Sequence, residues 1–190
     1  MQVQALAIPQ VKLLVPQVFR DERGFFTESY SARTFADAAG VTATFVQDNH
    51  SLSVAKGVVR GLHFQSTPDA QDKLVRVLRG SIFDVAVDIR VGSPTFGRHV
   101  TAILSAENAN QVWVPKGFAH GFCTLEPDTE VFYKTTAYYA PASDKGLRWN
   151  DPALAIAWPV TADAAILSAK DTSQLLLSEL PEYFRYGDAS

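Results

Sequence analysis

Residues 57–65 (GVVRGLHFQ) combine a group able to exchange protons with a fixed positive charge. His63 lies three residues after Arg60, and apolar residues surround both. Histidine gains and loses a proton near neutral pH, whereas arginine stays cationic. The segment predicts a strand whose polar side chains face a cavity. Such a cavity suits an anionic substrate undergoing proton transfer. For this segment alone, however, a barrel strand with one hydrogen-bonded core histidine is the favoured interpretation.

Four further residues could take part in the same chemistry, namely His120, Lys73, Tyr133 and Asp171. A histidine and a tyrosine on opposite walls can exchange protons on opposite faces of one carbon, as inversion of a stereocentre beside a carbonyl requires. A lysine ammonium can stabilise the oxygen of the enolate that forms, and a carboxylate can orient a histidine. Taken singly, Tyr133 also fits a barrel wall, Lys73 a strand end and Asp171 a turn cap.

A metal site is the other chemistry to consider. His63 and residues 115–120 (PKGFAH) resemble the two half-motifs of the cupin superfamily, whose jelly-roll barrels often bind a metal through three histidines and a glutamate. Here Gln65 replaces the second histidine, and residues 68–71 (PDAQ) replace the glutamate region. Glutamine is a poor ligand for a transition metal, and Lys73 nearby would repel a cation. We therefore predict a cupin-like barrel with no metal and no cofactor.

Composition sets the class of protein. The chain has 190 residues, 47% of them hydrophobic and 19% charged, which suits one globular domain spanning residues 1–190. A net charge of -3 provides no basic field for nucleic acid, and no apolar run is long enough to cross a membrane. One cysteine, Cys123, rules out an internal disulfide framework and fits a reducing compartment. Since the first residues also lack a signal-peptide pattern, we expect a cytoplasmic protein.

Many short strands separated by turns predict an all-β fold with few short helices. Ser31 and Gly40 mark the ends of a helix over residues 32–39, and residues 73–90 predict a hairpin that turns at Arg79-Gly80. Residues 3–19, interrupted by Pro9 and Pro16, predict an N-terminal β arm. The segment after Tyr139 is rich in turns, with a short helix expected over residues 175–180.

Several blocks, in order along the chain, resemble the dTDP-4-dehydrorhamnose 3,5-epimerase family. They run from about Phe19 to about Asp171 and comprise residues 21–26 (DERGFF), 47–51 (QDNHS), 60–65 (RGLHFQ), 71–76 (QDKLVR), 84–90 (DVAVDIR), 93–97 (SPTFG), 115–122 (PKGFAHGF), 149–152 (WNDP) and 167–171 (LSAKD). Any one block is weak evidence for the family, but several such blocks in the family order are specific to it. The resemblance implies a metal-independent cupin-type epimerase acting on dTDP-4-dehydro-6-deoxy-glucose at carbons 3 and 5.

The resemblance also implies roles for individual residues. His63 would be the base, Asp171 its orienting carboxylate, Tyr133 the opposing acid and Lys73 the partner of the enolate oxygen. Substrate contacts would come from Arg23 and Arg60 on the pyrophosphate, from Tyr139 stacked on thymine, and from Phe26, Glu28, Gln47, Asn49, His120, Asp144 and Lys170. The family often has glutamate at position 144, so Asp144 has the shorter reach. A homodimer is implied, with each nucleotide site partly completed by the partner.

Three alternatives stay open on the sequence. One is an epimerase that inverts a single carbon of the same kind of sugar nucleotide. Another is a metal-dependent cupin, which Gln65 disfavours. The last is a nucleotide-sugar binding module without activity, which the full set of acid, base and orienting groups disfavours.

Overall fold

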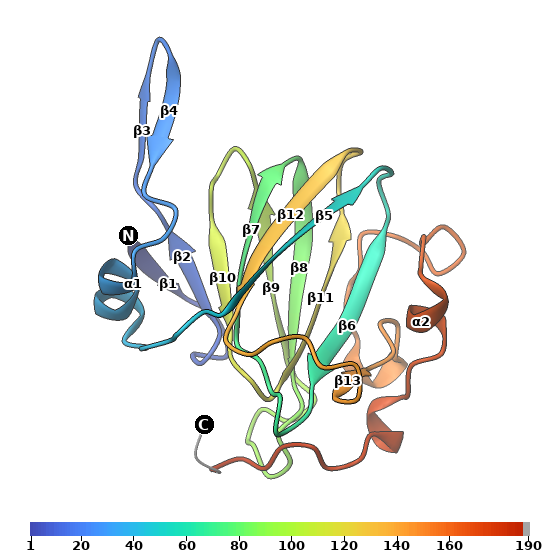
Figure 1. Cartoon of the computed structure of the whole chain (residues 1–190). Coiled ribbons are helices and arrows are strands. Elements are labelled where there is room, and N and C mark those ends of the chain that lie inside the picture. The colour runs from blue at the N-terminus through green and yellow to red at the C-terminus, as the bar shows by residue number, and fades with distance from the viewer. Residues whose placement is uncertain (188–190) are drawn as a thin grey trace.

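The computed structural model describes residues 1–187 and consists mainly of two β-sheets that face each other (Figure 1). The first sheet has six strands in the order β1 (Gln2–Ala5), β2 (Lys12–Val15), β10 (Gln111–Val114), β7 (Lys73–Arg79), β12 (Thr129–Thr135) and β5 (Gln47–Ser53). The second has five, in the order β13 (Asp144–Gly146), β6 (Val59–Gln65), β11 (Phe118–Thr124), β8 (Ser81–Asp88) and β9 (His99–Ser105). The predicted all-β, cupin-like fold is confirmed.

The predicted hairpin over residues 73–90 is wrong. Two strands form with Gly80 between them at φ 73°, but β7 pairs with β10 and β12, whereas β8 pairs with β9 and β11. The chain therefore crosses from one sheet to the other at Gly80. Buried side chains explain the crossing, because Val75 and Val77 of β7 pack between the sheets against Ile82 and Ala86 of β8.

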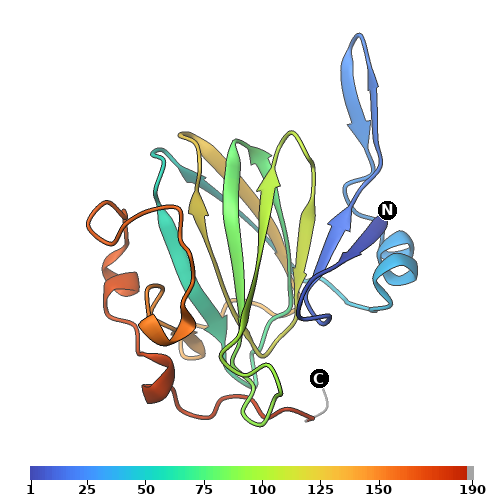
Figure 2. The same ribbon diagram turned by 180° about the vertical axis from the view of Figure 1, so that it is seen from behind.

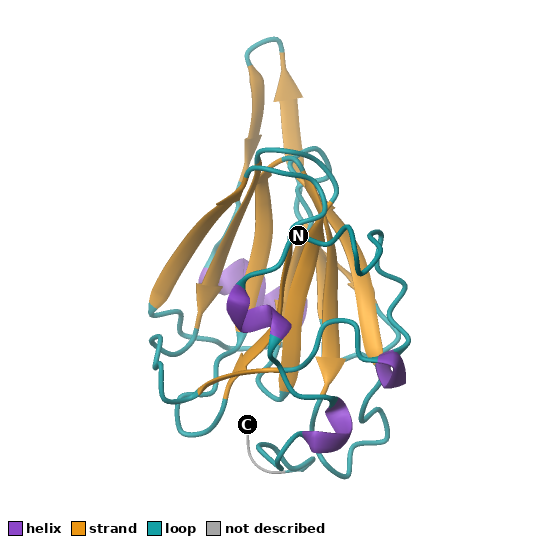
Figure 3. Ribbon diagram, turned by 90° about the vertical axis from the view of Figure 1, so that its right-hand side faces the viewer, coloured by secondary structure: helices purple, strands orange, loops and turns teal. Residues whose placement is uncertain are grey.

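Helices are few, short and peripheral to the strands (Figure 3). Helix α1 (Ala32–Ala39) has the predicted bounds: Ser31 Oγ accepts a hydrogen bond from the Thr34 amide, and Gly40 closes the helix at φ 65°. Phe35 of α1 packs on Leu74 and Trp113, on the outer face of the six-stranded sheet. The remaining short helices, all in the C-terminal third, are the 3-10 helix η1 (Pro152–Leu154), α2 (Ala169–Thr172) and the 3-10 helix η2 (Leu177–Glu179).

The N-terminal segment forms two structures. Strands β1 and β2 pair with each other and, through β2, with β10 of the same chain. The following hairpin of β3 (Val18–Asp21) and β4 (Gly24–Thr27) forms a separate two-stranded sheet that projects from the barrel, as Figure 1 and the reverse view in Figure 2 show. Phe25 and Phe26 on this hairpin are 58% and 70% exposed.

Alternation along β6 directs His63 between the sheets. Its neighbours Leu62 and Phe64 belong to an apolar cluster on the other side of the five-stranded sheet, under the C-terminal segment. Successive side chains of a strand point to opposite faces. Close packing of β6 and β11 also shapes this wall, since a Cβ built on Gly61 would lie 2.6 Å from the Gly121 Cα.

Candidate active site

A cavity of about 620 Å³ opens between the two sheets where β5 and β6 meet the C-terminal segment. It is lined by seven of the predicted site residues: Asn49, Arg60, His63, Lys73, His120, Tyr133 and Asp171. They come from β5, β6, β7, β11, β12 and α2, so every wall contributes a polar group. All four predicted catalytic residues are among them.

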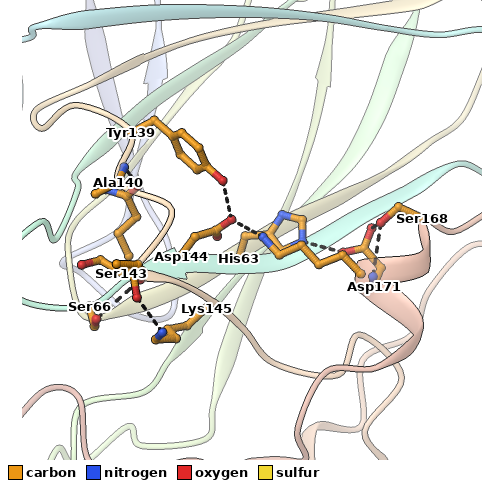
Figure 4. A network of polar contacts seen from close by, with 12 residues as sticks. His63, Ser66, Tyr139, Ala140, Ser143, Asp144, Lys145, Ser168 and Asp171 are labelled. Atoms are coloured by element: carbon orange, nitrogen blue, oxygen red, sulfur yellow. Dashed lines mark hydrogen bonds and ion pairs between the residues drawn. The ribbon is translucent and has the colours of Figure 1, made fainter.

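His63 and Asp171 form the closest polar pair in this cavity (Figure 4). His63 Nε2 lies 2.5 Å from Asp171 Oδ1, and Ser168 Oγ donates to Asp171 Oδ2 at 2.7 Å. Burial alone would raise the pKa of Asp171, but the hydrogen bond and charge of His63, together with Ser168, outweigh it and lower the pKa. An ionised Asp171 accepts the Nε2 proton, which leaves Nδ1 of His63 as the nitrogen able to take up a proton.

Lys73 and Tyr133 lie on β7 and β12, which are neighbours in the opposite sheet. Burial lowers the pKa of Lys73 to about 8, although the negative charges of Asp144 and Asp84 act against this. Lys73 Nζ donates to the His63 carbonyl at 3.3 Å, so the ammonium is anchored beside the histidine strand. Burial also raises the pKa of Tyr133. Tyr133 therefore keeps its proton at neutral pH, as an acid must.

A second histidine–aspartate pair lies deeper in the wall. His120 is directly opposite His63 in the β6–β11 register, and its Nε2 is 2.8 Å from Asp84 Oδ2. Both side chains are buried. Asp84 is thus paired with His120 as Asp171 is paired with His63, but the His120–Asp84 pair is far less exposed to solvent.

Arg60 is held toward the cavity by β5. Its Nε donates to Ser53 Oγ at 3.1 Å, and its Nη2 donates to the Leu52 carbonyl at 3.1 Å. These two bonds leave part of the guanidinium free for an anionic ligand.

A smaller cavity of about 160 Å³ adjoins the first and shares Asn49, His63, Lys73 and Tyr133 with it. Its other lining residues include the predicted site residues Gln47, Tyr139, Asp144 and Lys170. Asp144 Oδ2 accepts a hydrogen bond from the Tyr139 hydroxyl at 3.1 Å (Figure 4). The same oxygen forms an ion pair with Lys170. These predicted ligand contacts are therefore hydrogen-bonded to one another.

Three predicted substrate contacts line neither of these two cavities. Arg23, Phe26 and Glu28 lie on or just after the projecting β3–β4 hairpin, and all three are exposed. Arg23 forms an ion pair with its neighbour Asp21 at 2.5 Å. The chain alone does not bring these residues to His63.

Gln65 occupies the position of a cupin metal ligand, but its amide is used within the protein. Nε2 donates to the carbonyls of Asp69 and Tyr138, and Oε1 accepts from the Ala140 amide. Across residues 1–187, no group of three or more histidine, cysteine or acidic side chains is arranged to bind a metal ion.

Sequence reasoning missed three supporting residues: Ser53, Asp84 and Ser168. Asp84 carried a usable signal, because it is a charged residue inside the apolar run of residues 82–87. Ser53 carried none, whereas Ser168 lies in the block of residues 167–171 but had no predicted role.

Comparison with known proteins decides the family. The family model described as dTDP-4-dehydrorhamnose 3,5-epimerase matches residues 5–179. This chain belongs to that family. A 3,5-epimerase of Sinorhizobium fredii is 53% identical over 186 residues, covering 98% of this chain and 94% of the relative. The predicted resemblance, and with it the prediction of an epimerase, is confirmed.

Solved 3,5-epimerase structures agree with the fold. The Legionella pneumophila enzyme, crystallised in complex with dTDP-4-keto-L-rhamnose, superposes with a TM-score of 0.93 at 48% identity and covers 97% of this chain and 98% of its own. A more distant relative, the dTDP-4-dehydrorhamnose 3-epimerase of Streptomyces niveus, is 39% identical over 179 residues, or 94% of this chain and 85% of its own length. The similarity is thus greater to the 3,5-epimerases than to this single-carbon relative.

No helix in the described part of the chain is both long and apolar enough to span a membrane.

Proposed function

We propose that this chain epimerises dTDP-4-dehydro-6-deoxy-D-glucose at carbons 3 and 5 to give dTDP-4-dehydro-L-rhamnose, a step of dTDP-rhamnose biosynthesis. The observation that carries the proposal is one cavity lined by the His63–Asp171 pair, Tyr133 and Lys73, in a chain of the 3,5-epimerase family. Each group has a part in moving a proton from one face of a carbon to the other.

The reaction begins with His63 as the general base. Its Nδ1 removes the proton from the carbon beside the ketone, and the electrons of that C–H bond move onto the carbonyl oxygen. Asp171 stabilises the imidazolium through the hydrogen bond at Nε2. The ammonium of Lys73 stabilises the enolate oxygen, where negative charge develops.

Inversion follows when Tyr133 returns a proton to the opposite face of the same carbon. The carbonyl re-forms as the enolate electrons bond the carbon to the phenol proton. Solvent then reprotonates Tyr133 and takes the proton from His63, so no atom is gained or lost overall. The same cycle at the second carbon completes the reaction without a cofactor.

Nucleotide binding is assigned to the remaining predicted residues. Arg60 binds the pyrophosphate, where a guanidinium fork matches paired oxygens. Tyr139 stacks on thymine, and further contacts come from Gln47, Asn49, His120, Asp144 and Lys170. Because the β3–β4 hairpin is exposed, we assign Arg23, Phe26 and Glu28 to the cavity of a partner subunit in a homodimer.

We also expect this enzyme to act in the cytoplasm as one domain, without nucleic acid or membrane partners. The single cysteine fits a reducing compartment. Cys123 is also buried, and burial raises the pKa of its thiol to about 11, so we expect this thiol to be unreactive.

Deuterium exchange tests the reaction. The protein is incubated with the dTDP-4-keto sugar in deuterated water, and the sugar is analysed by NMR. We expect deuterium at both carbon 3 and carbon 5. Label at one carbon alone would favour a single-carbon epimerase, and label at neither would overturn the proposal.

A further inference from the structure

We propose that three glutamine side chains, Gln47, Gln65 and Gln71, act together as positioning residues for Tyr139. We call this set the glutamine clamp. It goes beyond the contacts assigned above because Gln65 and Gln71 act on the protein rather than on the substrate. The inference rests on the proposed function in one respect, namely that Tyr139 stacks on the nucleotide base.

The segment that carries Tyr139 is irregular. Residues 137–140 follow β12 and precede β13, and no backbone group of residues 137–139 is paired with another backbone group within residues 1–187. Backbone N–H and C=O groups near a cavity need partners. Without them the segment would be free to change conformation.

Glutamine amides supply those partners at four consecutive residues. Gln71 Nε2 donates to the Ala137 carbonyl at 2.8 Å, and Gln65 Nε2 donates to the Tyr138 carbonyl at 3.1 Å. The amide of Tyr139 donates to Gln47 Oε1 at 2.9 Å, and the amide of Ala140 donates to Gln65 Oε1 at 2.8 Å. The Ala137 carbonyl also accepts a hydrogen bond from Thr135 Oγ1 at 3.0 Å, so the glutamines, together with this hydroxyl, replace the neighbouring strand that the segment lacks.

Gln65 is the centre of the clamp. It is only 4% exposed, and its second Nε2 hydrogen is donated to the Asp69 carbonyl at 2.7 Å. Gln65 also lies directly opposite Asp144 in the β6–β13 register, and Asp144 accepts the Tyr139 hydroxyl. The backbone and the hydroxyl of Tyr139 are therefore both held at the same place in the barrel, where β6 pairs with β13.

The clamp is neutral, which matters because it lines the smaller cavity together with His63, Lys73 and Tyr133. An amide offers a donor and an acceptor, like a peptide group, without adding a charge that would shift the pKa of these residues. The Tyr139 ring itself is on the outside, 57% exposed. A rigid backbone beneath an exposed ring lowers the entropic cost of stacking a ligand on it.

The central test is a double-mutant cycle on binding of dTDP, measured by isothermal titration calorimetry. Gln65→Glu keeps the side-chain size but removes the donor nitrogen, so we expect dTDP to bind about tenfold more weakly or worse. The clamp holds the backbone of Tyr139, so Tyr139→Ala leaves its bonds in place while removing the ring. In the Tyr139→Ala background, the remaining effect of Gln65→Glu should be only the repulsion between its added charge and the pyrophosphate, so the loss of dTDP affinity should be clearly smaller.

A matched control is Asn108→Asp. The Asn108 amide also makes three bonds to backbone groups, with Ile103 and Ser105 at the end of β9 and with Asn110 in the following turn, but Asn108 lines neither cavity. We expect unchanged dTDP affinity in this variant. Gln71→Ala, which removes one clamp bond, should weaken dTDP binding by about threefold and serves if Gln65→Glu does not fold.

Hydrogen exchange by mass spectrometry provides a readout without ligand. A peptide covering Tyr139 and Ala140 should be protected in the wild type and should exchange faster in Gln65→Glu or Gln71→Ala. Unchanged protection and unchanged dTDP affinity in the folded clamp variants would overturn the inference, as would an equal loss of affinity with and without the Tyr139 ring. Failure of the proposed reaction is seen separately, as absence of deuterium exchange in a wild type that still binds dTDP.

Discussion

The cavity and the β3–β4 hairpin carry residues of the same family motifs, yet the chain supports them very differently. In the cavity, His63 bonds to Asp171, Asp171 bonds to Ser168, and Arg60 bonds to β5. On the hairpin, the side-chain bonds that Arg23 makes within residues 1–187 all go to Asp21, two residues away, and its side chain is 85% exposed. A motif can therefore identify a functional residue without showing that one chain alone places it.

The largest effect expected from the cavity is that of His63→Ala. Removing the base should lower turnover by about 10²–10⁴-fold and abolish deuterium exchange at both carbons. NMR of the sugar in deuterated water measures the exchange, and dTDP affinity controls for binding. A His63→Ala variant that still loads deuterium would assign the base to another residue.

Tyr133→Phe tests whether Tyr133 and His63 act on opposite faces of the reacting carbon. The phenyl ring keeps the packing but cannot donate a proton, so net inversion should fall by about 10²-fold. His63 can still remove and return a proton on its own face, so some exchange without inversion should persist. Identical behaviour of Tyr133→Phe and His63→Ala would show that the division of roles is wrong.

Arg23→Ala tests whether the hairpin serves another subunit. Loss of its charge-assisted contact with pyrophosphate should raise KM by about tenfold with a smaller effect on kcat. Co-expression with His63→Ala under two affinity tags gives a mixed dimer, in which one site combines an intact Arg23 with an intact His63. If Arg23 acts across the interface, the mixed dimer regains a normal KM at that site.

Absence of that recovery would mean that Arg23 acts within its own chain or not at all. A sedimentation measurement showing only monomer would contradict the homodimer directly.

For Lys73 in the cavity, we expect a smaller effect on kcat that depends on pH. Burial lowers its pKa from 10.5 to about 8, so the ammonium is present below pH 8 and is lost as pH rises through that value. If the charge stabilises the enolate, kcat should be about half its plateau value at pH 8 and fall further above it. In Lys73→Arg the guanidinium keeps its charge, so a falling limb at the same pH in that variant would assign it to another group.

Local features of the fold could be predicted from the sequence, and long-range pairings could not. The ends of α1 follow from Ser31 and Gly40, whose effects reach only a few residues. The hairpin predicted at Gly80 failed because strand pairing depends on partners far away, such as β10 and β12 for β7.

The same limit applies to the site. Residue types pointed to a base, an acid and an anion-binding arginine, but His63 and Asp171 are 108 residues apart. Only the family resemblance placed them together in advance. The sequence predicted that Gln65 does not bind a metal, but it did not predict that Gln65 bonds to Tyr138 and Ala140. Those two residues lie 73 or more positions away in an irregular segment, and no local sequence pattern around position 65 indicates such a contact.

Asp171 belongs to the C-terminal segment and not to either sheet. That segment is attached on one side by Ile166, which bonds to Gly57 and Val59, and on the other by Leu175, which bonds to Arg148. Local opening of the short stretch between these two points, which also holds Leu167 packed near Trp149 and the Gln174 carbonyl bonded to Arg148, costs less free energy than unfolding the barrel. On mild heating or in dilute denaturant, activity should therefore disappear while the β-sheet circular dichroism is still intact, and the inactivation should reverse on return to native conditions.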